Sequence, residues 1–357
     1  DDRGASFSDG HLSWREHHER ARTAVAHIRS RISSNAPPHF GVLLPNVSTL
    51  SVLLEGAAIS PLVLVALNPL RTPDALAADA VIADCSVIVT DSHHRHLLAS
   101  VPDHIEIIDA ADLAEPIRVD TESFTPRPDD LFALVFTSGT SGNPKAVRCN
   151  HDKVAGAGRM LAGRFGLGAD DTVYVSMPLF HSNAILAGWA VGVASTGSLA
   201  VARTFSASGF LPDVRRYGAT YANYVGTPLS YVLATPERPD DRENPLRHVY
   251  GNEGRPEDLA AFAARFDVTV TDGYGSTEGG IALRRTPDTP PSALGPATPD
   301  LAVVDPDTDR VCATALFDST GRPTNPDDAI GELVNTSGAG SFSGYYRDSA
   351  ADADRMR

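Results

Sequence analysis

The sequence predicts an α/β protein built from two parallel-rich sheets that are covered by helices. The first observation behind this prediction is that short apolar runs alternate with helix-like segments along almost the whole chain. The second is that these runs are apolar on both faces, which is typical of strands buried in parallel sheets. The third is the length of 357 residues with 42% hydrophobic and 21% charged side chains, which supplies a large core and excludes disorder over most of the chain.

The alternation predicts individual elements. Strands are expected at residues 40–44, 62–67, 86–90, 131–136, 172–176, 220–225 and 268–271, and helices at residues 47–58, 153–165, 228–234 and 257–266. Residues 182–202 carry no charge and are long enough for a membrane span. They contain several glycines and hydroxyl residues and few large aliphatic ones, so a buried helix that turns at Gly197 into a core strand is the favoured interpretation.

Proline-rich and acidic segments predict the boundaries. Residues 115–130 lose the periodic pattern, which divides the chain into units at 1–120, 121–295 and 296–357, the last of them rich in β-structure. Residues 235–245 and 286–299 are expected to form loops. The chain begins without methionine and ends in a charged, helix-forming run without a capping signal, so we expect it to be part of a longer polypeptide.

Composition excludes several functions. With 30 basic and 45 acidic residues the net charge is −15, which argues against nucleic-acid binding and against attachment to anionic lipid by charge alone. The three cysteines form no CxxC pair, which excludes a disulfide framework and a zinc finger and indicates a reducing cytosol. The histidines show no metal-ligand spacing. Only Lys145 and Lys153 are lysines, and every other basic residue is arginine.

The first chemical motif follows the strand expected at 131–136. Residues 137–145 read Thr-Ser-Gly-Thr-Ser-Gly-Asn-Pro-Lys. Glycines allow close approach to a ligand, hydroxyls and backbone N–H groups donate hydrogen bonds, and Lys145 adds a positive charge. This combination suits a polyphosphate. It is not a Walker A loop, because Lys145 follows proline and precedes alanine.

The second motif follows the strand expected at 268–271. Residues 272–278 read Asp-Gly-Tyr-Gly-Ser-Thr-Glu, at the carboxyl edge of a sheet, where open α/β sheets bind ligands. Tyr274 offers a flat face to a purine, Thr277 a donor to a phosphate, and Glu278 a hard oxygen ligand to Mg²⁺. Between the two motifs, His181 follows an apolar run, where a histidine is more often packed or solvated than functional.

Residues 134–145 resemble the signature loop of the acyl-adenylating superfamily, which includes acyl-CoA synthetases, luciferases and peptide-synthetase adenylation domains. Residues 272–278 resemble the fifth core motif of the same family. The resemblance implies that the loop grips the β- and γ-phosphates of ATP and that His181 gates the acyl site. The implied contacts to ATP are Thr137, Ser138, Gly139, Thr140, Ser141, Gly142, Lys145, Gly251, Asn252, Glu253, Asp272, Tyr274, Gly275, Ser276 and Thr277.

Less generic residues resemble a subfamily, the very-long-chain acyl-CoA synthetases or fatty acid transport proteins and their bacterial relatives. These residues include the runs 205–210 and 251–256 and the segment Tyr224-Val225-Gly226. The resemblance implies that Tyr224, Gly226 and His181 bind the acyl substrate. It also implies that residues 331–333 and 344–346 form the sixth core motif, whose role in the family is largely structural.

The resemblance implies an ATP-dependent fatty-acid–CoA ligase for long or very long chains. A carboxylate would attack the α-phosphorus of ATP, and the thiol of coenzyme A would then displace AMP. A carboxylate is already ionised at pH 7, so the first step needs no general base. Lys145, Thr277 and Glu278 with its Mg²⁺ are the expected catalytic groups. A cytoplasmic protein is expected, with peripheral association at the inner face of the membrane left open.

The sequence departs from the family after residue 346. There the family continues into a mobile C-terminal lid domain that carries a second catalytic lysine, whereas no lysine follows Lys153 in these 357 residues. We therefore expect the chain as given, without that lid, to bind nucleotide weakly, to adenylate poorly and not to form the thioester. The alternatives are a CoA ligase for a sterol side-chain, bile-acid-like or carnitine-like acid, an acyl-AMP ligase that loads a carrier protein, and a non-catalytic nucleotide or acyl binder.

Overall fold

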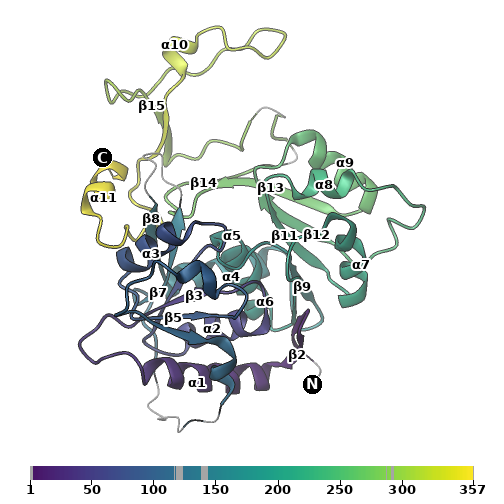
Figure 1. Ribbon diagram of the computed structural model, residues 1–357. Coiled ribbons are helices and arrows are strands. Elements are labelled where there is room, and N and C mark those ends of the chain that lie inside the picture. The colour runs from purple at the N-terminus through teal and green to yellow at the C-terminus, as the bar shows by residue number, and fades with distance from the viewer. Residues whose placement is uncertain are drawn as a thin grey trace.

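The computed structural model describes residues 3–115, 117, 124–137, 144–286, 288–290 and 293–356 (Figure 1). It contains two large sheets and a two-stranded ribbon. The six-stranded sheet has the order β6 (Glu106–Asp109), β5 (Val87–Thr90), β3 (His39–Leu43), β4 (Val63–Ala66), β7 (Leu131–Thr137) and β8 (Lys145–Asn150). Only β8 runs antiparallel to its neighbour in this sheet.

The eight-stranded sheet has the order β14 (Ala282–Arg284), β13 (Thr269–Gly275), β12 (His248–Asn252), β11 (Tyr221–Val225), β9 (Thr172–Val175), β10 (Ser198–Val201), β1 (Gly4–Phe7) and β2 (Gly10–Ser13). Its edge strands β14 and β2 are antiparallel to their neighbours, and the others are parallel. The fold class predicted from the sequence is confirmed, and every strand expected above is present within a few residues.

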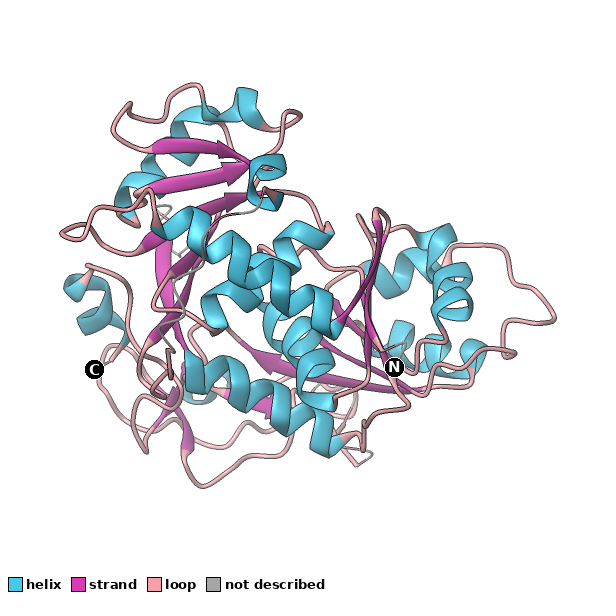
Figure 2. Cartoon of the chain, turned by 90° about the horizontal axis from the view of Figure 1, so that it is seen from below, coloured by secondary structure: helices cyan, strands magenta, loops and turns pink. Residues whose placement is uncertain are grey.

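The helices form one shared layer and two outer layers. Between the sheets lie α1 (Trp14–Arg29), α2 (Ser48–Ala58), α4 (His151–Arg164) and α6 (Ala190–Ser195), whose apolar residues join both sheets in one core. Figure 2 shows helices crossing the middle of the molecule. The six-stranded sheet is covered outside by α3 (Pro73–Ile82) and the 3₁₀ turn Arg95–Leu98, and the eight-stranded sheet by α7 (Ala207–Tyr217), α8 (Pro228–Leu233) and α9 (Pro256–Phe266). A second 3₁₀ turn spans Ala110–Ala114.

The buried strands explain why the sequence folds this way. All five residues of β3 are buried. Phe40 and Val42 face the shared core, whereas Leu43 faces the outer layer that contains α3. Because both faces of the strand are covered, neither face carries an exposed polar side chain, and the sequence reads as a continuous apolar run.

The uncharged segment at 182–202 is a buried helix followed by a core strand, as predicted. It consists of α5 (Ser182–Ala184), a π-helical turn (Ile185–Trp189) and α6, after which the chain turns into β10. A Cβ atom on Gly197 would lie 2.2 Å from the carbonyl oxygen of Asp171, so only glycine fits at this turn. No helix in the described part of the chain is both long and apolar enough to cross a membrane.

Sheet membership does not follow the division expected at residue 120. Strands β7 and β8 complete the six-stranded sheet, and β1 and β2 join the eight-stranded one. Each large sheet thus combines strands from both sides of residue 120. Sheet membership alone does not define domains, and the three-part division of the chain stays a prediction. All three cysteines are free thiols, and two of them, Cys85 and Cys149, are buried.

The last part of the chain forms an arm and then returns to the first sheet (Figure 1). The arm contains the ribbon of β15 (Leu301–Val304) and β16 (Glu332–Asn335) and the short helix α10 (Pro326–Ala329). Residues 344–346 then pair with β8, through an N–H of Arg148 to the carbonyl of Gly344 at 3.1 Å and an N–H of Tyr346 to the carbonyl of Ala146 at 2.8 Å. Helix α11 (Ser349–Arg355) follows.

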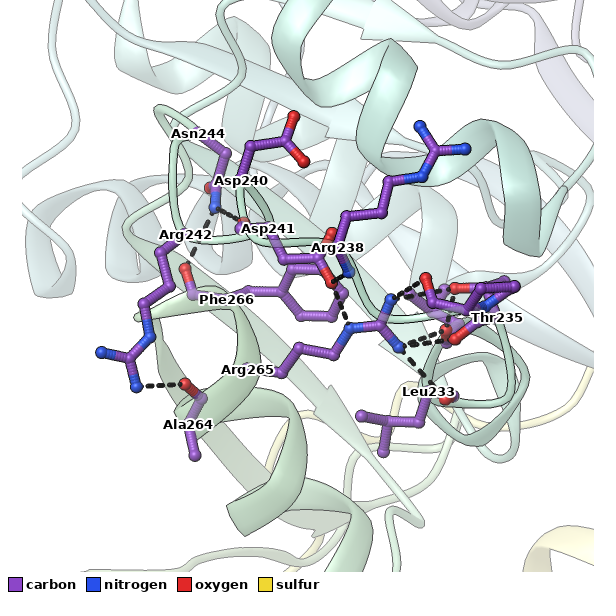
Figure 3. A network of polar contacts seen from close by, with 12 residues as sticks. Leu233, Thr235, Arg238, Asp240, Asp241, Arg242, Asn244, Ala264, Arg265 and Phe266 are labelled. Atoms are coloured by element: carbon purple, nitrogen blue, oxygen red, sulfur yellow. Dashed lines mark hydrogen bonds and ion pairs between the residues drawn. The ribbon is translucent and has the colours of Figure 1, made fainter.

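The loop expected at residues 235–245 is fastened by one buried arginine of α9 (Figure 3). The side chain of Arg265 is 7% exposed and its Nε lies 2.7 Å from Oδ2 of Asp241, whose side chain is 5% exposed. The same guanidinium donates to the carbonyls of Leu233, Thr235 and Pro236 at 2.9–3.1 Å. Burial raises the pKa of Asp241, but hydrogen bonds from Arg265 and from the Arg238 N–H outweigh it and hold that pKa below its usual range.

Candidate functional site

The predicted phosphate loop joins two paired strands. Thr137 at the end of β7 and Lys145 at the start of β8 are register partners, so they lie opposite each other at the base of a hairpin. The predicted contacts from Ser138 to Gly142 lie outside the described residues. The Oγ1 atom of Thr137 is buried and has no hydrogen-bond partner among the described residues. Such an atom is costly unless a ligand or water satisfies it.

The second motif ends in a loop, residues 276–278, that follows β13. The hydroxyl of Tyr345 donates to Oε1 of Glu278 at 2.9 Å, and the Nζ of Lys145 lies 5.1 Å from the centre of the same tyrosine ring. Burial by itself raises the pKa of Glu278, but hydrogen bonds from its own N–H, from Tyr345 and from Ser276 outweigh it, so the pKa lies below its usual range. A cation from one sheet and an ionised carboxylate beside the other therefore meet at one aromatic residue.

The side chain of Lys153 holds the backbone of the 276–278 loop. Its Nζ donates to the carbonyl oxygens of Thr277 at 2.5 Å and of Glu278 at 2.8 Å. The residue is only 9% exposed, and burial lowers the pKa of its amine, against the opposite influence of Cys149 and Glu278. The side chain of Thr277 is held as well, because its hydroxyl shares a 2.7 Å hydrogen bond with the hydroxyl of Ser182.

A cavity of about 250 Å³ lies at the carboxyl ends of β12 and β13. Tyr274 is 41% exposed and forms part of its wall. Ala293 also lines the cavity, and its carbonyl accepts a hydrogen bond of 2.6 Å from Arg285. The remaining lining residues are Asn252, Glu253, Gly254, Pro256, Asp272, Gly273, Gly275, Arg285 and Leu294. Five of the residues predicted to contact ATP thus surround one cavity: Asn252, Glu253, Asp272, Tyr274 and Gly275.

The backbone is closely packed next to this cavity. Gly251 lies so near β11 that a Cβ atom would stand 2.2 Å from the carbonyl oxygen of Tyr224. Glu253, directly after β12, has a φ of +66°, which is uncommon for a residue with a side chain and is found mostly where the surrounding structure enforces it. The carboxylate of Asp272 is buried and accepts hydrogen bonds from the hydroxyl of Tyr224 at 2.5 Å and from the N–H of Gly254 at 3.0 Å.

The predicted acyl-site residues occupy different environments. Tyr224 is 2% exposed and its hydroxyl supports Asp272, so a direct substrate contact by this side chain stays a prediction. Gly226 has a φ of +68° and its N–H donates to the carbonyl of Asn252 at 2.9 Å. His181 precedes α5, and its ring lies beside that of Phe180, tilted by 36° with ring centres 5.1 Å apart. Partial burial lowers the pKa of its imidazole, although the residue as a whole is exposed.

An asparagine chain ties the start of α5 to the cavity. The side-chain amide of Asn223 donates to Oδ1 of Asn183 at 2.7 Å, and that of Asn183 donates to Oδ1 of Asn252 and to the carbonyl of Tyr224, both at 3.1 Å. The segment that carries His181 is therefore linked to the cavity through Asn252 and to the 276–278 loop through Ser182.

Three residues of this site were missed at the level of the sequence. Lys153 was noted only as one of two lysines, Tyr345 only as part of a structural motif, and Ser182 only as part of an uncharged segment. Lysine scarcity was the one available signal, since a chain that otherwise uses arginine places both of its lysines next to the first motif. The contacts of Tyr345 and Ser182 span 67 and 95 residues, which no local pattern reveals.

The fold is shared with a solved enzyme. O-succinylbenzoate coenzyme A synthetase (MenE) from Bacillus subtilis, solved in complex with ATP and magnesium ion, matches with a TM-score of 0.78, covering 99% of this chain and 71% of that chain at 18% identity. The chain thus has the fold of this class of synthetase. A family model described as AMP-binding enzyme matches residues 1–346, and the chain belongs to that family.

Two curated relatives are similar over almost the whole chain. The medium/long-chain-fatty-acid–CoA ligase FadD17 of Mycobacterium marinum is 53% identical over 359 residues, which cover 99% of this chain and 68% of the relative. A steroid-22-oyl-CoA synthetase of Rhodococcus jostii is 42% identical over 355 residues, which cover 94% of this chain and 62% of the relative. The resemblance inferred from the motifs is confirmed, and these relatives support an acyl-CoA ligase.

Proposed function

We propose that this chain binds Mg·ATP and a fatty carboxylate as the substrate-binding part of an ATP-dependent fatty-acid–CoA ligase. The observation that carries the proposal is the meeting of Lys145 and Glu278 at Tyr345, because a polyphosphate with its metal needs a cation and a carboxylate side by side. The names of the curated relatives support a fatty acid and coenzyme A as the other reactants.

The residues present fit ATP and Mg²⁺. The Oγ1 of Thr137, which has no partner among the described residues, suits a phosphate oxygen, and the cavity beside Tyr274 suits the nucleoside. No group of three or more His, Cys, Asp or Glu residues in the described ranges could hold a metal by itself. Mg²⁺ commonly binds one or two carboxylates together with substrate phosphates, so Glu278 and the nucleotide would hold it jointly.

Positioning and charge are the contributions of this chain to the chemistry. An ionised acyl carboxylate needs no base, so the chain has to hold it in line with the α-phosphorus while pyrophosphate leaves. Lys145 and the hydroxyl of Thr277 would stabilise negative charge on the phosphates, as fixed donors do in such sites. The bound Mg²⁺ would neutralise further phosphate charge. Coenzyme A thiol then takes the acyl group and AMP leaves.

We further infer that the 357-residue chain tested alone binds nucleotide but turns over poorly. No lysine follows Lys153 in it, and the family resemblance requires a second catalytic lysine beyond the first. Within the acyl-CoA ligase assignment, the steroid-22-oyl relative favours a second candidate substrate, a steroid side-chain carboxylate. A carrier-protein acceptor and a non-catalytic binder remain the alternatives to the coenzyme A reaction.

Calorimetric titration of the 357-residue chain with Mg·ATP tests the proposal. Glu278→Gln removes the proposed metal ligand and should weaken binding at least as much as the roughly 10- to 100-fold lost when a metal site loses an outer-shell group, whereas Glu19→Gln removes an exposed carboxylate on α1 and should change nothing. Absence of Mg·ATP binding by the unaltered chain would refute the proposal.

The acid is identified by a separate measurement. Fatty acids of 8 to about 20 carbons and a steroid-22-oic acid are each added with Mg·ATP, and the thermal midpoint and pyrophosphate release are followed. The acid that stabilises the chain most is the assigned substrate. Rapid, sustained pyrophosphate release by this chain alone would contradict the inferred need for a further lysine.

A further inference from the structure

The buried ammonium of Lys153 breaks two local rules. It lies in the first turn of α4, where its N–H is capped by Oδ1 of Asn150 at 2.8 Å. The positive end of the helix dipole disfavours a cation there. A buried charge is also expected to be paired, yet no ion pair between described residues includes Lys153. Departures of this kind are expected at functional sites, where a compensating role outweighs the local cost.

The partners of this ammonium identify the role. Both are backbone carbonyl oxygens of the 276–278 loop, those of Thr277 at 2.5 Å and Glu278 at 2.8 Å. Two consecutive carbonyls held by one Nζ fix the peptide between them, and with it the direction in which the Glu278 side chain leaves the backbone. Tyr345 then fixes the carboxylate at its far end.

We propose that Lys153 is a positioning residue for the metal-bound nucleotide: it fastens the 276–278 loop so that Glu278 is preset to receive Mg²⁺ with the ATP phosphates. This inference rests on the proposed function and adds to it a residue that the motifs do not contain. Lys153 is not among the residues that line the nucleoside cavity, so its loss should weaken the metal-dependent part of binding and spare the nucleoside part.

The test compares Lys153→Met, Lys153→Arg and Arg159→Met with the unaltered chain. Arg159 is an exposed cation on the same helix and serves as the matched control. Two affinities are measured for each protein: that for ATP as a function of Mg²⁺ concentration, by calorimetry, and that for adenosine without metal, by ligand-observed NMR. Circular dichroism establishes that each variant is folded. Lys153→Gln, which keeps a side-chain donor, replaces the methionine variant if the latter does not fold.

Lys153→Met should raise the Mg²⁺ concentration needed for half-maximal ATP binding about tenfold or more, in the range seen for supporting groups of metal sites. Its adenosine affinity should stay within twofold, Lys153→Arg should recover most of the loss, and Arg159→Met should match the unaltered chain. An unchanged Mg²⁺ dependence, or an equal loss of ATP and adenosine affinity, would overturn the inference. If the unaltered chain does not bind Mg·ATP, the proposed function itself fails, which is a different result.

Discussion

Replacing Arg265 by methionine is expected to destabilise the protein by about 3–5 kcal/mol, the range found when one partner of a buried ion pair is removed. The side chain donates to the carboxylate of Asp241 and to the carbonyls of Leu233, Thr235 and Pro236. Its loss leaves a buried charge and up to three carbonyls without their donor. Each stranded carbonyl alone costs about 1–3 kcal/mol, but the loop can open to water, so these costs do not add.

Urea unfolding followed by circular dichroism and tryptophan fluorescence measures the effect. If the unpaired carboxylate of Asp241 causes most of the destabilisation, the double variant Arg265→Met, Asp241→Asn should be more stable than Arg265→Met alone by about 1 kcal/mol or more. Arg242→Met is the control, because the side chain of Arg242 is exposed and donates to the carbonyl of Ala264 at 3.0 Å. If Arg265→Met lowers the free energy of unfolding no more than Arg242→Met does, the stabilisation assigned to this network is refuted.

Three further changes have defined outcomes. Gly251→Ala places a Cβ 2.2 Å from a carbonyl oxygen and should lower both the thermal midpoint and the affinity for ATP, whereas Gly156→Ala, with nothing within 4 Å of its Cβ, should leave both unchanged in the same scans. Burial raises the pKa of Asp79 from 3.8 to about 6, against the ion pair with its arginine partner. Because the folded protein binds this proton more tightly than the unfolded chain, Asp79 stabilises the fold fully below pH 3.8, and this stabilisation is lost as the pH rises through about 6. The free energy of unfolding changes by about 3 kcal/mol over that range, at 1.4 kcal/mol per pH unit. Asp79→Asn should flatten that part of the stability profile, and an unchanged profile would show that another group causes it. Tyr345→Phe removes a charge-assisted hydrogen bond to Glu278, so Mg·ATP binding should weaken about tenfold and the acid limb of its pH profile should move upward; unaltered calorimetric titrations would contradict this.

Much of the fold could be predicted because strands that are buried on both faces consist almost entirely of apolar residues. The run at 40–44 is apolar throughout because β3 is buried on both faces. The N-terminal strands β1 and β2 were not predicted, since both are only four residues long and β1 joins the sheet by pairing with β10, almost 200 residues away, while β2 pairs with β1. The π-helical turn at Ile185–Trp189 was not predicted either, because its geometry depends on packing against β9 and β11.

In the site, too, residues within a local motif could be predicted and contacts between distant segments could not. Tyr274, Thr277 and Glu278 were predicted because they lie within one short motif, and Lys145 because it ends another. What no motif contains is the contact between them. Tyr345 reaches Glu278 only because residues 344–346 return to pair with β8. A contact of this kind is a product of topology, and a reading of local patterns does not supply it.

The fastening of the 276–278 loop has a mechanical consequence. The loop extends from the eight-stranded sheet, yet it is held by Tyr345 on the edge of the six-stranded sheet and by Lys153 on the helix that follows β8. The two sheets therefore cannot shear against each other without first pulling these groups apart. Nucleotide affinity therefore depends on how the two sheets are aligned. A core substitution far from the site that tilts one sheet should reduce nucleotide binding at temperatures well below the melting temperature of the protein.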